Sequence, residues 1–63
     1  MWTVVYIAPN QKEAEAIQKN LILEGFLVKL RAIGAIQSGG ANSVEVLVPE
    51  SEVDEAMEVI NAR

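Results

Sequence analysis

Residues 2–8 constrain the fold of this chain more than any other stretch of its 63 residues. The stretch reads Trp-Thr-Val-Val-Tyr-Ile-Ala, and its β-branched and aromatic side chains predict a β-strand. A strand with one wet face alternates apolar and polar residues, but here only Thr3 interrupts the apolar run. Both faces of the strand therefore need a cover, and in so short a chain a second copy of the protein is one candidate.

Composition narrows the ways in which such a small domain can be stabilised. A chain of about 60 residues buries only about 60% of the surface that its unfolded form exposes. The absence of Cys and His excludes disulfides, thiolate metal sites, the usual zinc ligand and the commonest general base. The 51% hydrophobic content then favours oligomerisation as the remaining reinforcement, with a well-packed monomer as the alternative.

The charge balance argues against two classes of partner. Nine acidic and five basic residues give a net charge of −4, whereas nucleic-acid binding needs a basic stripe. No run reaches the roughly 18 apolar residues of a membrane span, and no basic segment of a signal peptide precedes residues 2–8. We therefore expect neither a nucleic-acid nor a membrane partner, and a cytoplasmic location by default.

Capping and breaking residues delimit a helix after this strand. Pro9 ends the strand, and Asn10 is a predicted N-cap, with Glu13 placed to complete a capping box. The helix is expected over residues 11–24, and Gly25 is expected to end it in a left-handed conformation. A ligand contact at the helix N-terminus is the alternative role for Asn10, although the cap accounts for it.

A second helix is predicted over residues 52–62, with Ser51 as its N-cap. Its first half is acidic, which suits the positive end of the helix dipole. A solvated face explains this run of carboxylates, and a docking site for a basic partner is the alternative. The apolar stripe expected to face the core consists of Val53, Ala56, Met57 and Ile60.

Two further strands are expected at residues 26–33 and 44–48. In an antiparallel pair, residues that lie opposite one another point to the same side of the sheet. Matching the apolar positions of the two strands then places Arg31 opposite Glu45. The sequence therefore predicts an Arg31–Glu45 ion pair on the face of the sheet away from the helices.

The connection between these two strands is a candidate contact loop. Residues 34–43 are more than the 2–5 residues of a usual hairpin loop, and long loops often carry function. Neither a phosphate-binding Walker sequence nor a dinucleotide-binding glycine motif can be written on it. A passive hairpin tip and a partner-binding loop both remain open. In the second case the contact residues are Gly34, Ile36, Gln37, Ser38, Gly39, Gly40 and Asn42.

The element order predicts a single α+β domain, residues 1–63, with a ferredoxin-like βαββα fold. A right-handed crossover places the third strand in the centre of a three-stranded mixed sheet, with two helices on one face. The first strand is then an edge strand, and no further strand follows in this sequence. Val5 and Ile7 are expected in the core. The open face of the sheet is expected to carry Trp2, Val4 and Tyr6.

This first strand predicts self-association. Proteins normally blunt a flat apolar edge with charge, Pro or a bulge, and contiguous apolar surface marks interfaces. The sequence therefore predicts a homodimer formed through the open sheet face, the edge of the first strand, or both. The residues expected at that interface are Trp2, Val4, Tyr6, Lys29, Arg31 and Leu47.

Several segments resemble a family of small bacterial proteins. They are Val5–Asn10, Glu13–Ala16, Leu23–Val28, Val46–Glu50 and Glu55–Ala56. The family is described as signal-transducing, is a domain of unknown function, and belongs to the PII (GlnB-like) superfamily. The resemblance implies a ferredoxin-like βαββα fold and places the functional loop of PII proteins at residues 34–43. It does not imply ATP or 2-oxoglutarate binding, because this chain lacks the later strand and loops of the PII nucleotide site.

Three functions follow from these features. The first is a small non-enzymatic regulatory or protein-interaction module in signal transduction, acting as a homo-oligomer and able to contact a protein partner. The second is a small-molecule-sensing domain, similar to ACT or PII domains, that binds a metabolite at a subunit interface. The third, an enzyme, is disfavoured because the chain offers only scattered carboxylates. We expect no catalytic residues, no metal and no cofactor.

Overall fold

The computed structural model describes residues 1–33 and 43–62. Within these ranges the order of elements is that expected from the sequence, and the α+β class is confirmed. A short 3₁₀ helix joins the last strand to the second α-helix. The elements are β1 (Trp2–Ala8), α1 (Gln11–Leu23), β2 (Lys29–Ala32), β3 (Val44–Pro49), the 3₁₀ helix (Glu50–Glu52) and α2 (Val53–Ala62).

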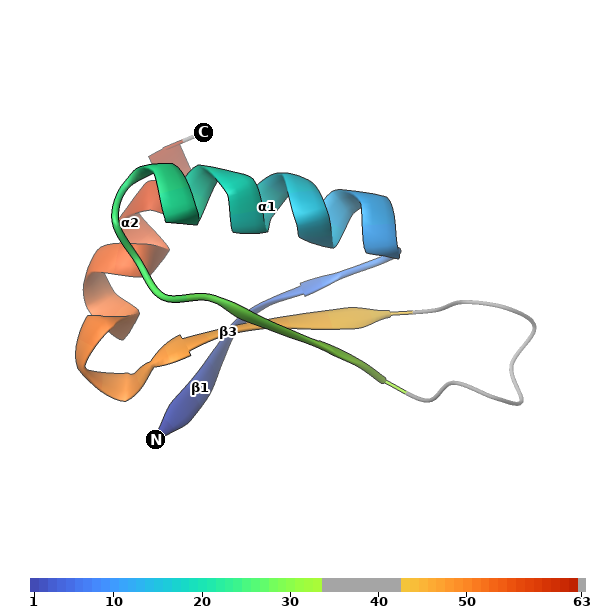
Figure 1. The fold of residues 1–63 in the computed structure, drawn as a ribbon, viewed down its shortest axis with the longest axis horizontal. Coiled ribbons are helices and arrows are strands. Elements are labelled where there is room, and N and C mark those ends of the chain that lie inside the picture. The colour runs from blue at the N-terminus through green and yellow to red at the C-terminus, as the bar shows by residue number, and fades with distance from the viewer. Residues whose placement is uncertain (34–42, 63) are drawn as a thin grey trace.

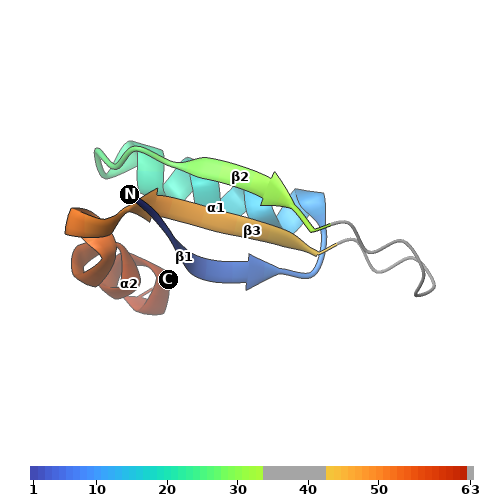
Figure 2. The same ribbon diagram turned by 90° about the horizontal axis from the view of Figure 1, so that it is seen from below.

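The sheet has the strand order β1-β3-β2, with β3 at its centre. Both hydrogen-bonded pairs, β1 with β3 and β2 with β3, are antiparallel. The expectation of a mixed sheet is therefore wrong. The edge strands β1 and β2 do run in the same direction, as Figure 2 shows, but β3 separates them, so they never form a parallel pair.

Both helices lie on the same face of the sheet (Figure 1). Their inward side chains meet those of β1 and β3 in one cluster of buried apolar residues. The largest side chains that are fully buried are Ile17 and Leu21 of α1 and Val46 and Val48 of β3. Because burial of apolar surface is the main favourable term in folding, this single layer of contacts holds the helices to the sheet.

Asn10 fixes the start of α1, as predicted. Its backbone is extended, with φ −158° and ψ 173°, and its Oδ1 accepts a hydrogen bond from the backbone N–H of Glu13 at 2.8 Å. The carbonyl of Asn10 also accepts the first intrahelical bond, from the N–H of Ala14 at 3.1 Å. The side-chain oxygen of Asn10 thus serves the helix cap.

Gly25 ends α1 in the left-handed region with φ +96°, as predicted. The N–H of Gly25 donates to the carbonyl of Ile22 at 2.9 Å, and the N–H of Phe26 donates to the carbonyl of Leu21 at 3.0 Å. These two bonds form a Schellman motif, which satisfies carbonyls that the helix end would otherwise leave unpaired.

Substitution of Gly25 isolates the strain of this backbone conformation, because an added Cβ would meet no atom within 4 Å. We expect Gly25→Ala to lower the free energy of unfolding by about 1–2 kcal/mol, the penalty of a left-handed residue with a Cβ. Gly25→Asn should lose less, because Asn tolerates this region. Urea unfolding followed by circular dichroism measures both variants, and an Ala variant as stable as the wild type would contradict the prediction.

A β-bulge interrupts the regular alternation of β1. Val4 and Tyr6 pair with adjacent residues of β3, so Val5 is an extra residue between them. Every side chain after the bulge therefore changes sides relative to a regular strand. Val5 lies in the core as expected, but Tyr6 also packs against the core, whereas Ile7 is 56% exposed. The expected positions of Tyr6 and Ile7 are both wrong, because simple alternation does not allow for an inserted residue.

The start and rotation of α2 also differ from the expectation. Pro49, with φ −60°, is followed directly by the 3₁₀ turn, so Ser51 lies inside that turn and the predicted N-cap is wrong. Met57 is 37% exposed rather than buried. Val59 packs against the core in its place, since α2 contacts α1 as well as the sheet.

The strand β2 is shorter than the predicted residues 26–33. Its ladder with β3 begins only at Lys29, because the chain must first descend from the end of α1 to the sheet. Phe26 and Val28 precede the ladder, yet both apolar side chains pack against the core. The apolar pattern therefore identifies the inward side chains correctly and overestimates the length of the strand.

Candidate functional site

The face of the sheet opposite the helices is the first candidate surface, and we call it the open face. The register places Val44, Val46 and Val48 toward the core, so the residues that alternate with them point away from it. The apolar side chains on the open face include Trp2, Ile7 and Ile33, which are 42%, 56% and 38% exposed. The residues of the open face include Trp2, Val4, Ile7, Lys29, Arg31, Ile33, Glu45 and Leu47.

Leu47 is buried on this face, with only 3% of its surface exposed, although no helix covers it. Its neighbours in the ladder are Val4 on one side and Lys29 on the other. The Lys29 ammonium lies 5.5 Å from the centre of the Trp2 ring, and these two residues belong to opposite edge strands. Their side chains therefore meet across β3, the strand that carries Leu47.

The predicted ion pair between Arg31 and Glu45 is confirmed. Nε of Arg31 donates to Oε1 of Glu45 at 2.6 Å, and Nη2 lies at the same distance from that oxygen. The Arg31 side chain is 61% exposed, so the pair contributes at most about 1 kcal/mol to stability. Its main effect is on the charge of the surface, because Arg31 and Glu45 neutralise one another and leave Lys29 as the third charge on the open face.

The structure brings together five of the six residues that the sequence placed at a self-association surface. Trp2, Val4, Lys29, Arg31 and Leu47 all lie on the open face. The sixth residue, Tyr6, lies on the other side of the sheet because of the bulge, and Ile7 takes its place on the open face. The unbroken apolar run of residues 4–8 holds no sequence signal for a bulge, so this exchange could not be read from the pattern. The two residues exchanged are Tyr6 and Ile7.

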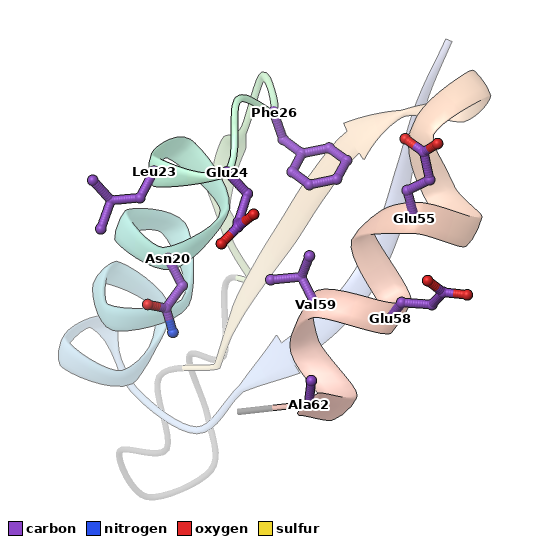
Figure 3. Close-up of a pocket in the computed structure, with 8 residues that line it drawn as sticks. All are labelled: Asn20, Leu23, Glu24, Phe26, Glu55, Glu58, Val59 and Ala62. Carbon is purple, nitrogen blue, oxygen red and sulfur yellow. The ribbon is translucent and has the colours of Figure 1, made fainter.

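A groove between α1 and α2 is the second candidate surface (Figure 3). It has a volume of about 670 Å³ and lies on the helix side of the molecule. Phe26 and Val59, both half-buried, project into the gap from its two sides. Around them stand residues of both helices that are exposed. These are Asn20, Leu23, Glu24, Glu55, Glu58 and Ala62.

Other candidate positions within the described ranges add no site to these two. The predicted contact residues in 34–42 lie outside the described residues. In residues 1–33 and 43–62, no three Asp or Glu side chains are grouped so that they could hold a metal ion. Neither α1 nor α2, the two α-helices of the described part, is long and apolar enough to cross a membrane.

Comparisons with known proteins were made at three levels. No protein family, no curated protein and no solved structure matched this chain. A function for the chain therefore has to be inferred from the geometry, burial and charge of its own surfaces.

Proposed function

We propose that this chain is a small regulatory or protein-interaction module that acts as a homodimer through the open face of its sheet. The observation that carries the proposal is the exposed apolar surface formed by Trp2, Ile7 and Ile33 on a face that no helix covers. Along β1 this surface runs from Trp2 through Val4 to Ile7, and contiguous apolar surface marks sites of association. Dimerisation would also bury the open face, and this added burial would stabilise a domain that is small and only marginally stable alone.

Charge supports the choice of this face and of a second copy as its occupant. The open face carries Lys29, Arg31 and Glu45, which give it a net charge of +1. Because the whole chain has a net charge of −4, the remaining residues together carry −5. Two copies that approach through any acidic surface repel one another. Through the open face, each copy presents apolar side chains and one balanced ion pair, so repulsion is smallest there.

The fold is compatible with a regulatory role of this kind. We assign it to the ferredoxin-like βαββα arrangement, supported by the central position of β3 and by the two helices on one face. The resemblance of the sequence to signal-transducing proteins of the PII superfamily supports the same assignment. A role in signal transduction remains part of this proposal, and so does a non-catalytic mode of action, which the lack of His and Cys favours.

The small-molecule-sensing alternative has less support. The Oδ1 of Asn10 is engaged by the helix cap, and the groove lies between the helices rather than at the proposed subunit interface. A metabolite at about 100 times its dissociation constant would add about 2.7 kcal/mol to the free energy of unfolding. A thermal-shift screen of nucleotides and amino acids therefore distinguishes the two functions, and a clear shift would favour the sensor.

The test of the dimer compares two exposed isoleucines on opposite sides of the molecule. Light scattering at about 100 µM, well above a micromolar dissociation constant, should give about twice the 6.9 kDa of one chain. Ile7→Lys should shift the mass to the monomer, because it places an ammonium in the apolar contact. Ile22→Lys should leave the dimer intact, since Ile22 is similarly exposed, at 53%, but lies on α1.

Two results would reject the proposal. One is a wild-type mass of 6.9 kDa under these conditions. The other is an equal effect of Ile7→Lys and Ile22→Lys on the mass, which would place the contact elsewhere. Circular dichroism of both variants shows whether the helices remain folded.

A further inference from the structure

The groove between α1 and α2 has an apolar floor, and the charged side chains that line it are all negative. Phe26 and Val59 form the floor, Glu24 and Glu55 stand at its rim, and Glu58 lines it from α2 with a carboxylate that points away from α1. No basic residue lines the groove within the described part of the chain, and none of these three carboxylates has an ion pair there. An unbalanced negative rim around apolar side chains is a surface that a positively charged, partly apolar ligand complements.

We propose that this groove binds a cationic peptide segment of a partner protein, with an apolar side chain over Phe26 and Val59 and flanking Lys or Arg side chains at the glutamates. Glu55 and Glu58 are three residues apart on α2, and Glu24 stands across the gap from α2 at the end of α1. Charge is thus placed on both sides of the floor, as a peptide with basic residues around an apolar one requires.

Other occupants fit the groove less well. Phosphates of nucleic acid or of an anionic membrane would be repelled by the rim. A second copy in a two-fold contact through the groove would bring each glutamate toward its own counterpart. The volume of about 670 Å³ falls in the range of roughly 300–1,000 Å³ that suits ligand pockets, which is enough for a few side chains.

This site is independent of the proposed dimer. The open face and the groove lie on the two opposite sides of the sheet–helix sandwich, so a dimer through the open face leaves the groove of each protomer accessible. One molecule can therefore pair with itself through the sheet and bind a basic partner through its helices. If the protein does not dimerise, the groove can still bind a peptide, and if the groove binds no peptide, the protein can still dimerise.

The test uses the fluorescein-labelled peptide Lys-Leu-Lys-Lys-Leu-Lys and the full chain, with fluorescence anisotropy as the measure of binding. Glu55→Gln/Glu58→Gln should weaken binding about tenfold, which corresponds to about 1.4 kcal/mol. The matched control, Glu50→Gln/Asp54→Asn, removes the same charge from the same acidic segment but from outside the groove. It should weaken binding by no more than about threefold, because screening reduces the effect of charges that make no contact.

A second comparison tests the apolar floor. The peptide Lys-Ser-Lys-Lys-Ser-Lys keeps all the charge and loses the apolar side chains, so it should bind more weakly than the leucine peptide. Amide chemical shifts in the bound protein should change mainly in residues 20–26 and 55–62, which contain the groove. These results together would identify a peptide site rather than a general attraction between opposite charges.

Several outcomes would overturn the inference. Equal losses in the two double variants would mean that charge alone attracts the peptide. Tight binding of spermine, or equal binding of the serine peptide, would show that the apolar floor has no role. Absence of binding at about 1 mM peptide, the weak end of measurable affinities, would also reject the site.

Discussion

Ile17→Ala is expected to unfold this protein or to bring it close to unfolding. Ile17 is fully buried in the centre of α1, where it packs among the strands. Truncation of a buried isoleucine costs about 2–5 kcal/mol, from lost burial and from the cavity left behind. A chain of 63 residues has a total stability of only about 3–9 kcal/mol at 0.05–0.15 kcal/mol per residue, so one such cavity removes much of it.

Ile22→Ala is the matched control for this prediction. It makes the same chemical change in the same helix, so any gain in helix propensity is equal, but Ile22 is 53% exposed. We expect its free energy of unfolding to stay within about 0.5 kcal/mol of the wild type. Urea unfolding followed by far-ultraviolet circular dichroism measures both variants, and equal midpoints would show that α1 does not pack as described.

Leu47→Ala should also be strongly destabilising, although Leu47 faces away from the helices. It is 3% exposed on the face where Trp2 and Lys29 meet, so its truncation should cost about 2–4 kcal/mol. Leu23→Ala, at an exposed position on α1, should cost less than about 0.5 kcal/mol. Both variants are compared by urea unfolding at one protein concentration, because dimerisation makes apparent stability depend on concentration.

A double-mutant cycle shows whether Trp2 is the residue that buries Leu47. If Trp2 covers Leu47, the losses in Trp2→Ala and Leu47→Ala overlap, and the double variant loses less than their sum. We expect a coupling energy of at least about 0.5 kcal/mol, as for residues in contact. Additive losses would mean that Leu47 is buried by other side chains.

The two faces of the molecule differ in the associations they favour. The open face has exposed apolar side chains and a net charge of only +1, which suits contact between identical chains. The helix side carries the carboxylates of α1 and α2, which repel a second copy and attract a basic segment. This division of charge gives the dimer and the groove different partners.

Local sequence signals determined a large part of the structure. Asn10 and Gly25 fixed both ends of α1, because their cap interactions lie within a few residues along the chain. The pairing of Arg31 with Glu45 followed from matching the apolar positions of two strands, since any shift by one residue would place apolar side chains in water. Five residues of the open face were identified as interface candidates from the sequence.

The tertiary structure decided what no local pattern could. Residues 2–8 are apolar on both faces, so their sequence is equally compatible with a regular strand and with a bulged one. The folded sheet has a bulge at Val5, which turns Tyr6 toward the core and Ile7 onto the open face. The groove likewise exists only because the end of α1 and the middle of α2 meet beside Phe26. Sequence determines the elements through contacts between near neighbours, whereas the sides that face a partner depend on contacts between residues far apart in the chain.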